Sequence, residues 1–180
     1  VLDWLKQHQP DALCLQELKL EEKNFPLAEI EAAGYHALFS GQKTYNGVAI
    51  LSKLPLQEVC AGIPGYEDEQ KRVLAATLEG VRLVCVYVPN GQSVDSDKYQ
   101  YKLQWLEALT AWLQEELARY PKLALLGDYN IAPEDRDAVN APQVAMLRAW
   151  VLIRSGERAE EGYAEFERLL KGPLGHVCGT

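Results

Sequence analysis

Apolar and polar residues follow one another, up to about residue 130, in a pattern typical of a mixed α/β chain. Short apolar runs bounded by turn residues predict buried strands at 12–15, 35–39, 48–51, 56–60, 73–78, 81–88 and 123–126. Apolar residues at helical spacing predict a helix over about 1–9, a second that begins at Pro26 and ends at Gly34, and a long third helix over Asp97–Arg119. The predicted fold class is therefore α/β.

The pattern changes after residue 137. Residues 146–153 and 158–170 have helical periodicity, whereas glycines and a proline are frequent in residues 171–180 and predict a frayed tail. No run between 138 and 180 predicts a strand. We therefore divide the chain into a first part, residues 1–137, and a divergent helical tail, residues 138–180.

The 180 residues leave room for one domain with one core. The chain has 18 basic and 26 acidic residues, and its net charge of −8 argues against a surface that is basic all over, while a local basic groove or a metal-bridged phosphate stays possible. Four scattered cysteines without zinc-finger spacing predict buried, reduced thiols at Cys14, Cys60, Cys85 and Cys178. No apolar run approaches the ~18 residues of a membrane helix and no leader precedes the first element, so we expect a cytoplasmic protein.

Polar residues follow three of the predicted strands, at 16–17, 87–91 and 127–130. In α/β enzymes the ends of neighbouring strands meet at one rim of the sheet, where rigid strands hold converging loops. These three segments would come together if their strands are neighbours in one sheet. The sequence contains neither a Gly-x-Ser-x-Gly nucleophile motif nor a phosphate-binding loop motif, so we do not favour either chemistry.

Each candidate side chain has a functional and a purely structural interpretation. Glu17, at the end of a buried strand, suits a hard-oxygen ligand of Mg²⁺, or it is a solvated glutamate. Asp128 and Asn130 share one side of an extended segment and suit a base that orients water and a donor to a phosphate oxygen, or they form an Asx turn. Tyr87 presents a phenol at the rim, or it packs as an amphipathic residue.

Four segments, in this order along the chain, resemble motifs of the exonuclease III family of DNA-repair nucleases, in the endonuclease/exonuclease/phosphatase superfamily. Residues 10–19 resemble a strand that ends in the Gln-Glu-x-Lys motif, and residues 45–52 resemble the next signature strand. Residues 87–91 are similar to the Tyr-x-Pro-x-Gly segment, and residues 127–133 to the Gly-Asp-x-Asn-Ile motif. The resemblance identifies residues 1–137 as the N-terminal part of such a domain.

The resemblance implies a DNase I-like fold, a four-layered two-sheet sandwich with outer helices, here incomplete. It also implies Mg²⁺-dependent hydrolysis of DNA phosphodiesters in base excision repair, as an exodeoxyribonuclease III or abasic-site endonuclease, with Mn²⁺ as a possible substitute. By resemblance Glu17, Asp128 and Asn130 lie at the metal. In that family's mechanism Tyr87 would stabilise the transition state from the side of the phosphate. Asp128 would orient the water as a base, and Asn130 would contact the phosphate.

The implied partner is double-stranded DNA with abasic sites or 3′ ends, with no membrane and no obligate protein partner. Polar residues near the predicted rim are candidates for contacts with the DNA, or else solvated surface groups. These candidates are Lys43, Asn46, Arg72, Asn90, Lys98 and Lys102.

The chain also departs from the family pattern. The family begins with a strand that carries an asparagine and closes with a Ser-Asp-His motif, and neither is found in this sequence. We therefore expect a truncated chain that is weakly active or inactive as a nuclease, because a lost charge-stabilising donor and a lost acid or base each cost about 10²-fold or more in rate. Two alternatives stay open: a phosphodiesterase of the same superfamily with a lipid or nucleotide substrate, and a non-catalytic DNA-binding or assembly fragment.

Overall fold

The computed structural model describes residues 1–92 and 96–131. The helices there are α1 (Leu2–His8), the short 3₁₀ helix η1 (Glu22–Asn24), α2 (Leu27–Ala32) and α3 (Asp97–Arg119). The strands are β1 (Ala12–Gln16), β2 (His36–Ser40), β3 (Val48–Ser52), β4 (Gln57–Ala61), β5 (Val73–Leu78), β6 (Val81–Tyr87) and β7 (Leu123–Asp128). Every predicted strand and helix of this part is confirmed within two residues at its ends, whereas the helical tail predicted over 138–180 lies outside the described residues.

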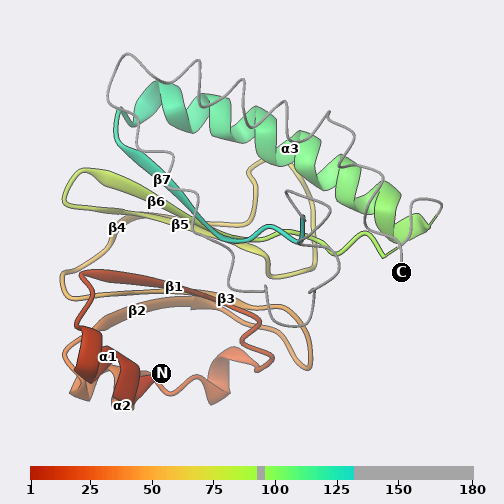
Figure 1. The fold of residues 1–180 in the computed structure, drawn as a ribbon. Coiled ribbons are helices and arrows are strands. Elements are labelled where there is room, and N and C mark those ends of the chain that lie inside the picture. Colours follow the sequence, from red (N-terminus) through yellow and green to blue (C-terminus); the bar gives the residue numbers. More distant parts are fainter. Residues whose placement is uncertain (93–95, 132–180) are drawn as a thin grey trace.

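Two sheets lie face to face and the helices cover their outer sides (Figure 1). One sheet has the strand order β1-β3-β2, with both neighbours antiparallel to β3. The other has the order β4-β5-β6-β7, in which only the last pair is parallel. Helices α1 and α2 lie on the first sheet and α3 lies on the second, so the predicted sandwich of two sheets with outer helices is confirmed for the described residues.

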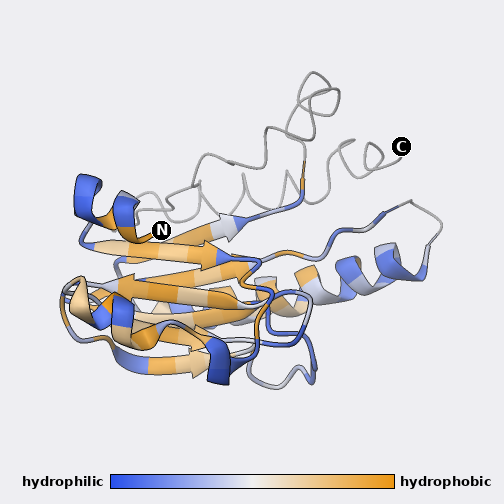
Figure 2. Cartoon of the chain, turned by 90° about the horizontal axis from the view of Figure 1, so that it is seen from below, coloured by the Kyte–Doolittle hydropathy of each residue, from blue (hydrophilic) through white to orange (hydrophobic). Residues whose placement is uncertain are grey.

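Alternating residues of each strand divide the core into layers. In β3, Val48 and Ile50 belong to the cluster between the two sheets, whereas Leu51 packs with Leu5 of α1 and Ile30 of α2. This division follows from the pleat, which sends successive side chains to opposite faces of the sheet. Figure 2 shows hydrophobic residues concentrated along the strands and hydrophilic residues on the loops and on much of the helices.

Helix α3 covers the second sheet and makes the crossover between its two parallel strands. Ser96 caps the helix, because its hydroxyl accepts a hydrogen bond from the backbone nitrogen of Tyr99 at 3.1 Å. Trp105, Leu109 and Trp112 form the apolar side of α3 and pack on the sheet. The crossover brings β7 beside β6 in the register Tyr87↔Asp128, which places the ends of two predicted motifs next to each other.

In the described stretches, no helix combines the length and apolar character needed to cross a membrane.

The three cysteines in the described part of the chain are all free thiols. Cys85 is buried, as predicted, whereas Cys14 and Cys60 are only partly buried because they lie on strands β1 and β4, at the edges of the two sheets. Cys178 lies outside the described residues.

Candidate active site at the strand ends

The three predicted segments meet at one rim of the sandwich. Tyr87 and Asp128 end the neighbouring strands β6 and β7 of one sheet, and Glu17 follows β1 of the other sheet. The two sheets are joined here by a short hydrogen bond, which the Tyr87 hydroxyl donates to the Glu17 carboxylate. The three strand ends converge, but the expectation that their strands are neighbours in one sheet is wrong, because β1 belongs to the other sheet and meets β6 and β7 across the sandwich.

Glu17 lies in a bend that is tied to the loop between β2 and β3. Its backbone has a left-handed φ of 53°, and the backbone nitrogen of Leu18 donates to the Gly47 carbonyl at 3.2 Å. The side chain is 44% exposed, and the Lys19 ammonium lies 2.7 Å from it. The hydrogen bond from Lys19, and then that from Tyr87, lower the pKa of the Glu17 carboxyl, so the group is anionic at neutral pH.

Tyr87 is partly buried and is contacted from both sides. Burial, and then the hydrogen bond to Glu17, raise the pKa of its phenol to about 12, so the phenol keeps its proton at neutral pH and acts as a donor. The Arg72 guanidinium lies over the ring, 4.8 Å from its centroid, and its Nη1 donates to the Tyr87 carbonyl at 3.0 Å. The phenol is thus held in one orientation.

Asp128 and Asn130 form the third corner of the site. The Asp128 Oδ1 accepts a hydrogen bond from the Asn130 backbone nitrogen at 2.9 Å, and the Asn130 Nδ2 donates to the Val88 carbonyl at 2.9 Å. Burial raises the pKa of the Asp128 carboxyl, the Asn130 hydrogen bond lowers it, and the nearby Glu17 charge raises it. The Asx turn that was the structural interpretation of this motif is present, and the turn itself presents Asp128 at the rim.

The donors at this rim fit a hard divalent cation. Glu17 and Asp128 supply carboxylate oxygens and Asn130 an amide, which are the ligand types that Mg²⁺ and Mn²⁺ prefer. Burial raises the pKa of Asp128 and the Glu17 charge raises it further, so a bound cation would favour the ionised form of the carboxyl. Within residues 1–92 and 96–131, no group of three or more His, Cys, Asp or Glu side chains is placed to hold a metal ion by itself.

Three of the candidate DNA contacts have exposed side chains. Lys43 lies in the loop between β2 and β3, Asn90 follows β6, and Lys98 lies in the first turn of α3. Asn90 also accepts a hydrogen bond from the Gln92 backbone nitrogen at 2.9 Å through its Oδ1. These positions leave the three side chains accessible to a large ligand.

The other three candidates differ from the expectation, because they form contacts inside the protein. Asn46 is 7% exposed and donates its amide to two neighbouring glutamines. Lys102 is 5% exposed, and its ammonium donates to the Asn130 carbonyl at 2.6 Å. This hydrogen bond stabilises the turn formed by residues 128–130. Arg72 is partly buried against Tyr87. Exposure had been inferred from polarity alone, and several of the partners that bury these side chains, such as Asn130 for Lys102, come from distant segments of the chain.

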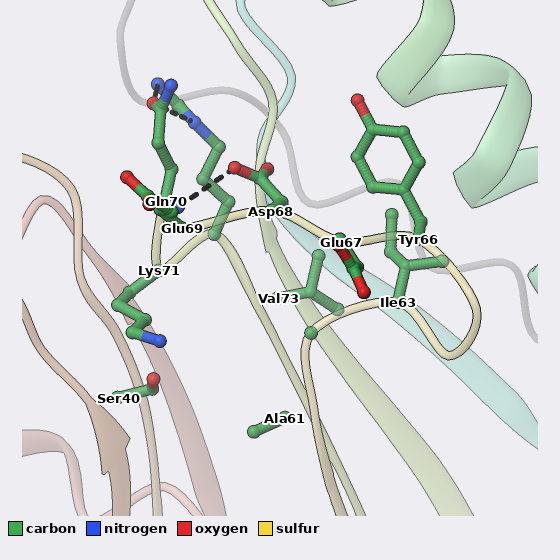
Figure 3. Close-up of a pocket in the computed structure, with 12 residues that line it drawn as sticks. Ser40, Ala61, Ile63, Tyr66, Glu67, Asp68, Glu69, Gln70, Lys71 and Val73 are labelled. Carbon is green, nitrogen blue, oxygen red and sulfur yellow. Dashed lines mark hydrogen bonds between the residues drawn. The ribbon is translucent and has the colours of Figure 1, made fainter.

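The sequence interpretation missed the polar loop between β4 and β5. Gln70, whose side chain accepts hydrogen bonds from Arg72 and Asn46, lies next to the site, and Asp68 accepts one from the Tyr101 hydroxyl of α3. The loop lines a pocket of about 550 Å³ (Figure 3). In the sequence the second half of this loop, residues 67–72, is a run of charged and amide residues, a composition that by itself indicates only a solvated connection.

A family model described as "Endonuclease/Exonuclease/phosphatase family" matches residues 1–144. Among curated proteins, exodeoxyribonuclease III from Haemophilus influenzae is 34% identical over 139 residues, which is 74% of this chain and 52% of that protein. The chain thus spans about half the length of the curated relatives it matches.

Two solved structures have a similar fold. The 3′ phosphatase NExo from Neisseria, bound to a product DNA hairpin, is 50% identical with a TM-score of 0.73, and the match covers 75% of this chain and 53% of that one. An AP endonuclease from Archaeoglobus fulgidus is 36% identical with a TM-score of 0.74, covering 94% of this chain and 63% of the other. At these identities the resemblance extends to sequence as well as to fold.

Proposed function

Since the chain belongs to the endonuclease/exonuclease/phosphatase family, we propose that its strand-end site hydrolyses phosphodiester bonds of DNA with the help of a divalent metal ion. The observation that carries the proposal is the convergence of Glu17, Tyr87 and Asp128 at one rim. The names of the similar proteins support DNA as the substrate, with 3′ ends and abasic sites as the places of attack.

In this proposal each side chain has a role that its surroundings favour. Asp128 receives the proton of the attacking water, and its raised pKa suits a group that must take up a proton at neutral pH. Tyr87 is protonated at that pH, and its one O–H turns from the Glu17 carboxylate to a non-bridging phosphate oxygen as negative charge grows there. Asn130, whose Nδ2 donates to the Val88 carbonyl at 2.9 Å, contacts the phosphate through its side-chain amide.

We propose that Glu17 would hold the metal ion, with Asp128 and Asn130 as further oxygen donors, and that the ion is Mg²⁺ with Mn²⁺ as a substitute. Such an ion neutralises the charge that develops on a phosphodiester during hydrolysis. The lowered pKa of Glu17 keeps its carboxylate ready to bind a cation at neutral pH. Lys19 occupies the other side of Glu17 and holds the carboxylate in place.

The test is an assay on duplex DNA that carries one tetrahydrofuran abasic analogue, beside a duplex with a recessed 3′ end. The full chain is expected to cleave only weakly in Mg²⁺ and not in EDTA, since it spans about half the length of its curated relatives. Asp128→Asn is expected to reduce that weak rate by about 10²–10⁴-fold, because the variant has no base for the water proton. DNA binding in Ca²⁺ should be retained by the variant. Cleavage that persists in EDTA, or that is unchanged in Asp128→Asn, would contradict the proposal, as would cleavage confined to lipid or nucleotide phosphodiesters.

A further inference from the structure

We propose that Gln70, a loop residue outside the assigned site, is a positioning residue that fixes Tyr87 through Arg72 and couples it to the loop between β2 and β3. The inference rests on the proposed function, since it concerns the same tyrosine. It is carried by a set of hydrogen bonds that converge on one side-chain oxygen.

The side chain of Gln70 forms two hydrogen bonds with the guanidinium group of Arg72. The Gln70 Oε1 accepts from the Arg72 Nε at 2.9 Å and from its Nη2 at 2.7 Å, so a single oxygen holds one edge of the guanidinium. The opposite edge donates from Nη1 to the Tyr87 carbonyl at 3.0 Å, and the group lies 4.8 Å over the Tyr87 ring. Because the guanidinium is planar and rigid, its orientation sets which way it meets the tyrosine. Gln70 therefore determines the orientation of the cation that packs on Tyr87.

The same oxygen also reaches the loop between β2 and β3. Asn46 donates through Nδ2 to the Gln70 Oε1 at 3.2 Å and to the Gln42 Oε1 at 3.1 Å, and the Gln42 Oε1 accepts from the Lys71 backbone nitrogen at 2.7 Å. This loop carries the exposed side chain of Tyr45. A ligand that touches the loop thus touches a segment bonded to the residue that orients Arg72.

The backbone of Gln70 is fixed from a third direction. Its nitrogen donates to the Asp68 Oδ1 at 2.9 Å, and the Asp68 Oδ2 accepts from the Tyr101 hydroxyl at 2.7 Å (Figure 3 shows Asp68 and Gln70). Because Tyr101 belongs to α3, the loop between β4 and β5 is anchored to the helix that packs on the sheet. A side chain held in this way is preorganised, and displacement of a catalytic group by about 1 Å can cost about 10²-fold in rate.

The proposal distinguishes positioning from simple stability through two substitutions at one site. Gln70→Met keeps the length of the side chain and removes the acceptor, whereas Gln70→Glu keeps an acceptor for Arg72 and Asn46. Gln70→Met is expected to lower kcat on the abasic duplex by about tenfold or more with little change in KM, and Gln70→Glu to retain kcat within about threefold. Glu69→Gln, an exposed neighbour in the same loop, is the matched control and should leave both constants unchanged.

A second measurement needs no catalysis. In the full chain without DNA or metal, the ¹³Cζ resonance of Tyr87, assigned with Tyr87→Phe, and the Arg72 Nε–H resonance are compared between variants. Both are expected to shift or broaden in Gln70→Met and to stay near their wild-type positions in Gln70→Glu and Glu69→Gln. Gln70→Ala repeats the comparison if Gln70→Met does not fold.

The two measurements separate the inference from the proposed function. If the wild-type chain does not cleave DNA, the proposed function fails while the resonances still decide whether Gln70 holds Arg72 on Tyr87. If the wild type cleaves and Gln70→Met keeps its kcat and its Tyr87 resonance, the positioning role is overturned and the nuclease stands. An equal loss of kcat in Gln70→Met and Gln70→Glu also overturns it, because the acceptor would then not matter.

Discussion

Gly127, which precedes Asp128, allows the backbone of β7 to approach β6 closely next to the candidate site. Its φ of +150° lies in a region that side chains rarely adopt, and a Cβ at this position would overlap the Val86 carbonyl of the neighbouring strand. The close approach is a consequence of the parallel pairing, in which Val86 and Gly127 are register partners. The glycine that precedes Asp128 therefore lets β7 lie against β6 and aims the carboxylate at the rim.

Gly127→Ala is expected to lower the free energy of unfolding by about 3 kcal/mol or more, because backbone strain and overlap add to each other. Gly65→Ala is a matched control: its φ of +77° is also positive, but nothing lies within 4 Å of the added methyl group, so about 1–2 kcal/mol is expected. Urea denaturation followed by circular dichroism measures both. Equal losses in the two variants would show that the close approach to Val86 has no cost of its own.

At the residue scale, the strand-end side chains were predictable and the buried polar contacts were not. Glu17 and Asp128 each lie two positions after the last residue of an apolar run, so their place at a strand end follows from the strand pattern alone. Asn46 and Lys102 were expected to meet DNA, yet they meet other parts of this chain. Whether a polar side chain is exposed depends on partners far along the sequence, and these cannot be read from local pattern.

Among the elements, α3 is joined to the sheet beneath it by a buried ion pair as well as by apolar packing. The Arg82 Nε of β6 lies 2.5 Å from the Glu116 Oε2 of α3, and both side chains are less than 5% exposed. Arg82 also donates to the Glu58 carbonyl at 2.6 Å and lies 4.7 Å from the centroid of the Tyr120 ring. The pair thus connects the helix to β6 and to β4 at the end of the sheet away from the site.

Glu116→Ala is expected to lower the free energy of unfolding by about 3–5 kcal/mol, because it leaves the Arg82 cation buried without its partner. The exposed neighbour gives the control, since Glu115→Ala should change the free energy by no more than about 0.5 kcal/mol. The double variant Arg82→Met/Glu116→Leu should recover most of the loss. A double variant as unstable as Glu116→Ala would mean that the lost packing, and not the stranded charge, is the cause.

The boundaries of α3 followed from periodicity, whereas its buried charge did not. The side of the helix that faces the protein was predicted only in part. Of the expected apolar stripe, Leu106 and Leu113 are buried, whereas Leu103 is 42% exposed. The buried side also holds Trp105 and Leu109, which the expected stripe, Tyr99, Leu103, Leu106, Leu113 and Leu117, did not include. Glu116 lies on that side among apolar residues, and only the arginine contributed by β6 makes its burial tolerable. In the same way, the order β1-β3-β2 joins segments that are not consecutive in the chain, so strand pattern alone could not supply it.

For the molecule as a whole, buried and partly buried tyrosines, among them Tyr87, Tyr101 and Tyr129, make the free energy of unfolding depend on pH in the alkaline range. Burial raises the pKa of the phenols of Tyr87, Tyr101 and Tyr129, and the hydrogen bond to Asp68 raises that of Tyr101 further. A phenol in the unfolded chain ionises near pH 10, so there the unfolded state loses its protons first. The stabilising contribution of these groups is complete below that pH and is lost as the pH rises through the folded-state values.

The free energy of unfolding is therefore expected to fall above about pH 10, by about 1.4 kcal/mol per pH unit for each phenol involved. Urea denaturation at intervals between pH 8 and 11 measures the slope. Tyr101→Phe should make the fall less steep, whereas Tyr45→Phe, at a side chain that is 68% exposed, should leave the slope unchanged. Identical slopes in all three proteins would rule out the buried Tyr101 phenol as a source of the effect.

At this scale the sequence predicted the layers and the family, because both depend on features that extend along the chain. The alternation of apolar runs predicts which faces are buried, and the order of the four motifs agrees with the family match over residues 1–144. The contacts that hold the site residues in place, such as those of Gln70 with Arg72, are individual hydrogen bonds between loop side chains. Such hydrogen bonds do not produce a periodic pattern in the sequence from which they could be predicted.

The parallel pairing of β6 and β7 also determines when the site can form. All other neighbouring strands in the second sheet are joined by hairpin-like connections, whereas β6 and β7 pair only after α3 has folded back across the sheet. Tyr87 therefore leaves the ribosome well before Asp128 can join it, and the antiparallel strands can pair in the meantime. We therefore expect the strand-end site to form late in folding. The stability of the packing of α3 on the sheet then determines how often β7 separates from β6 in the folded protein.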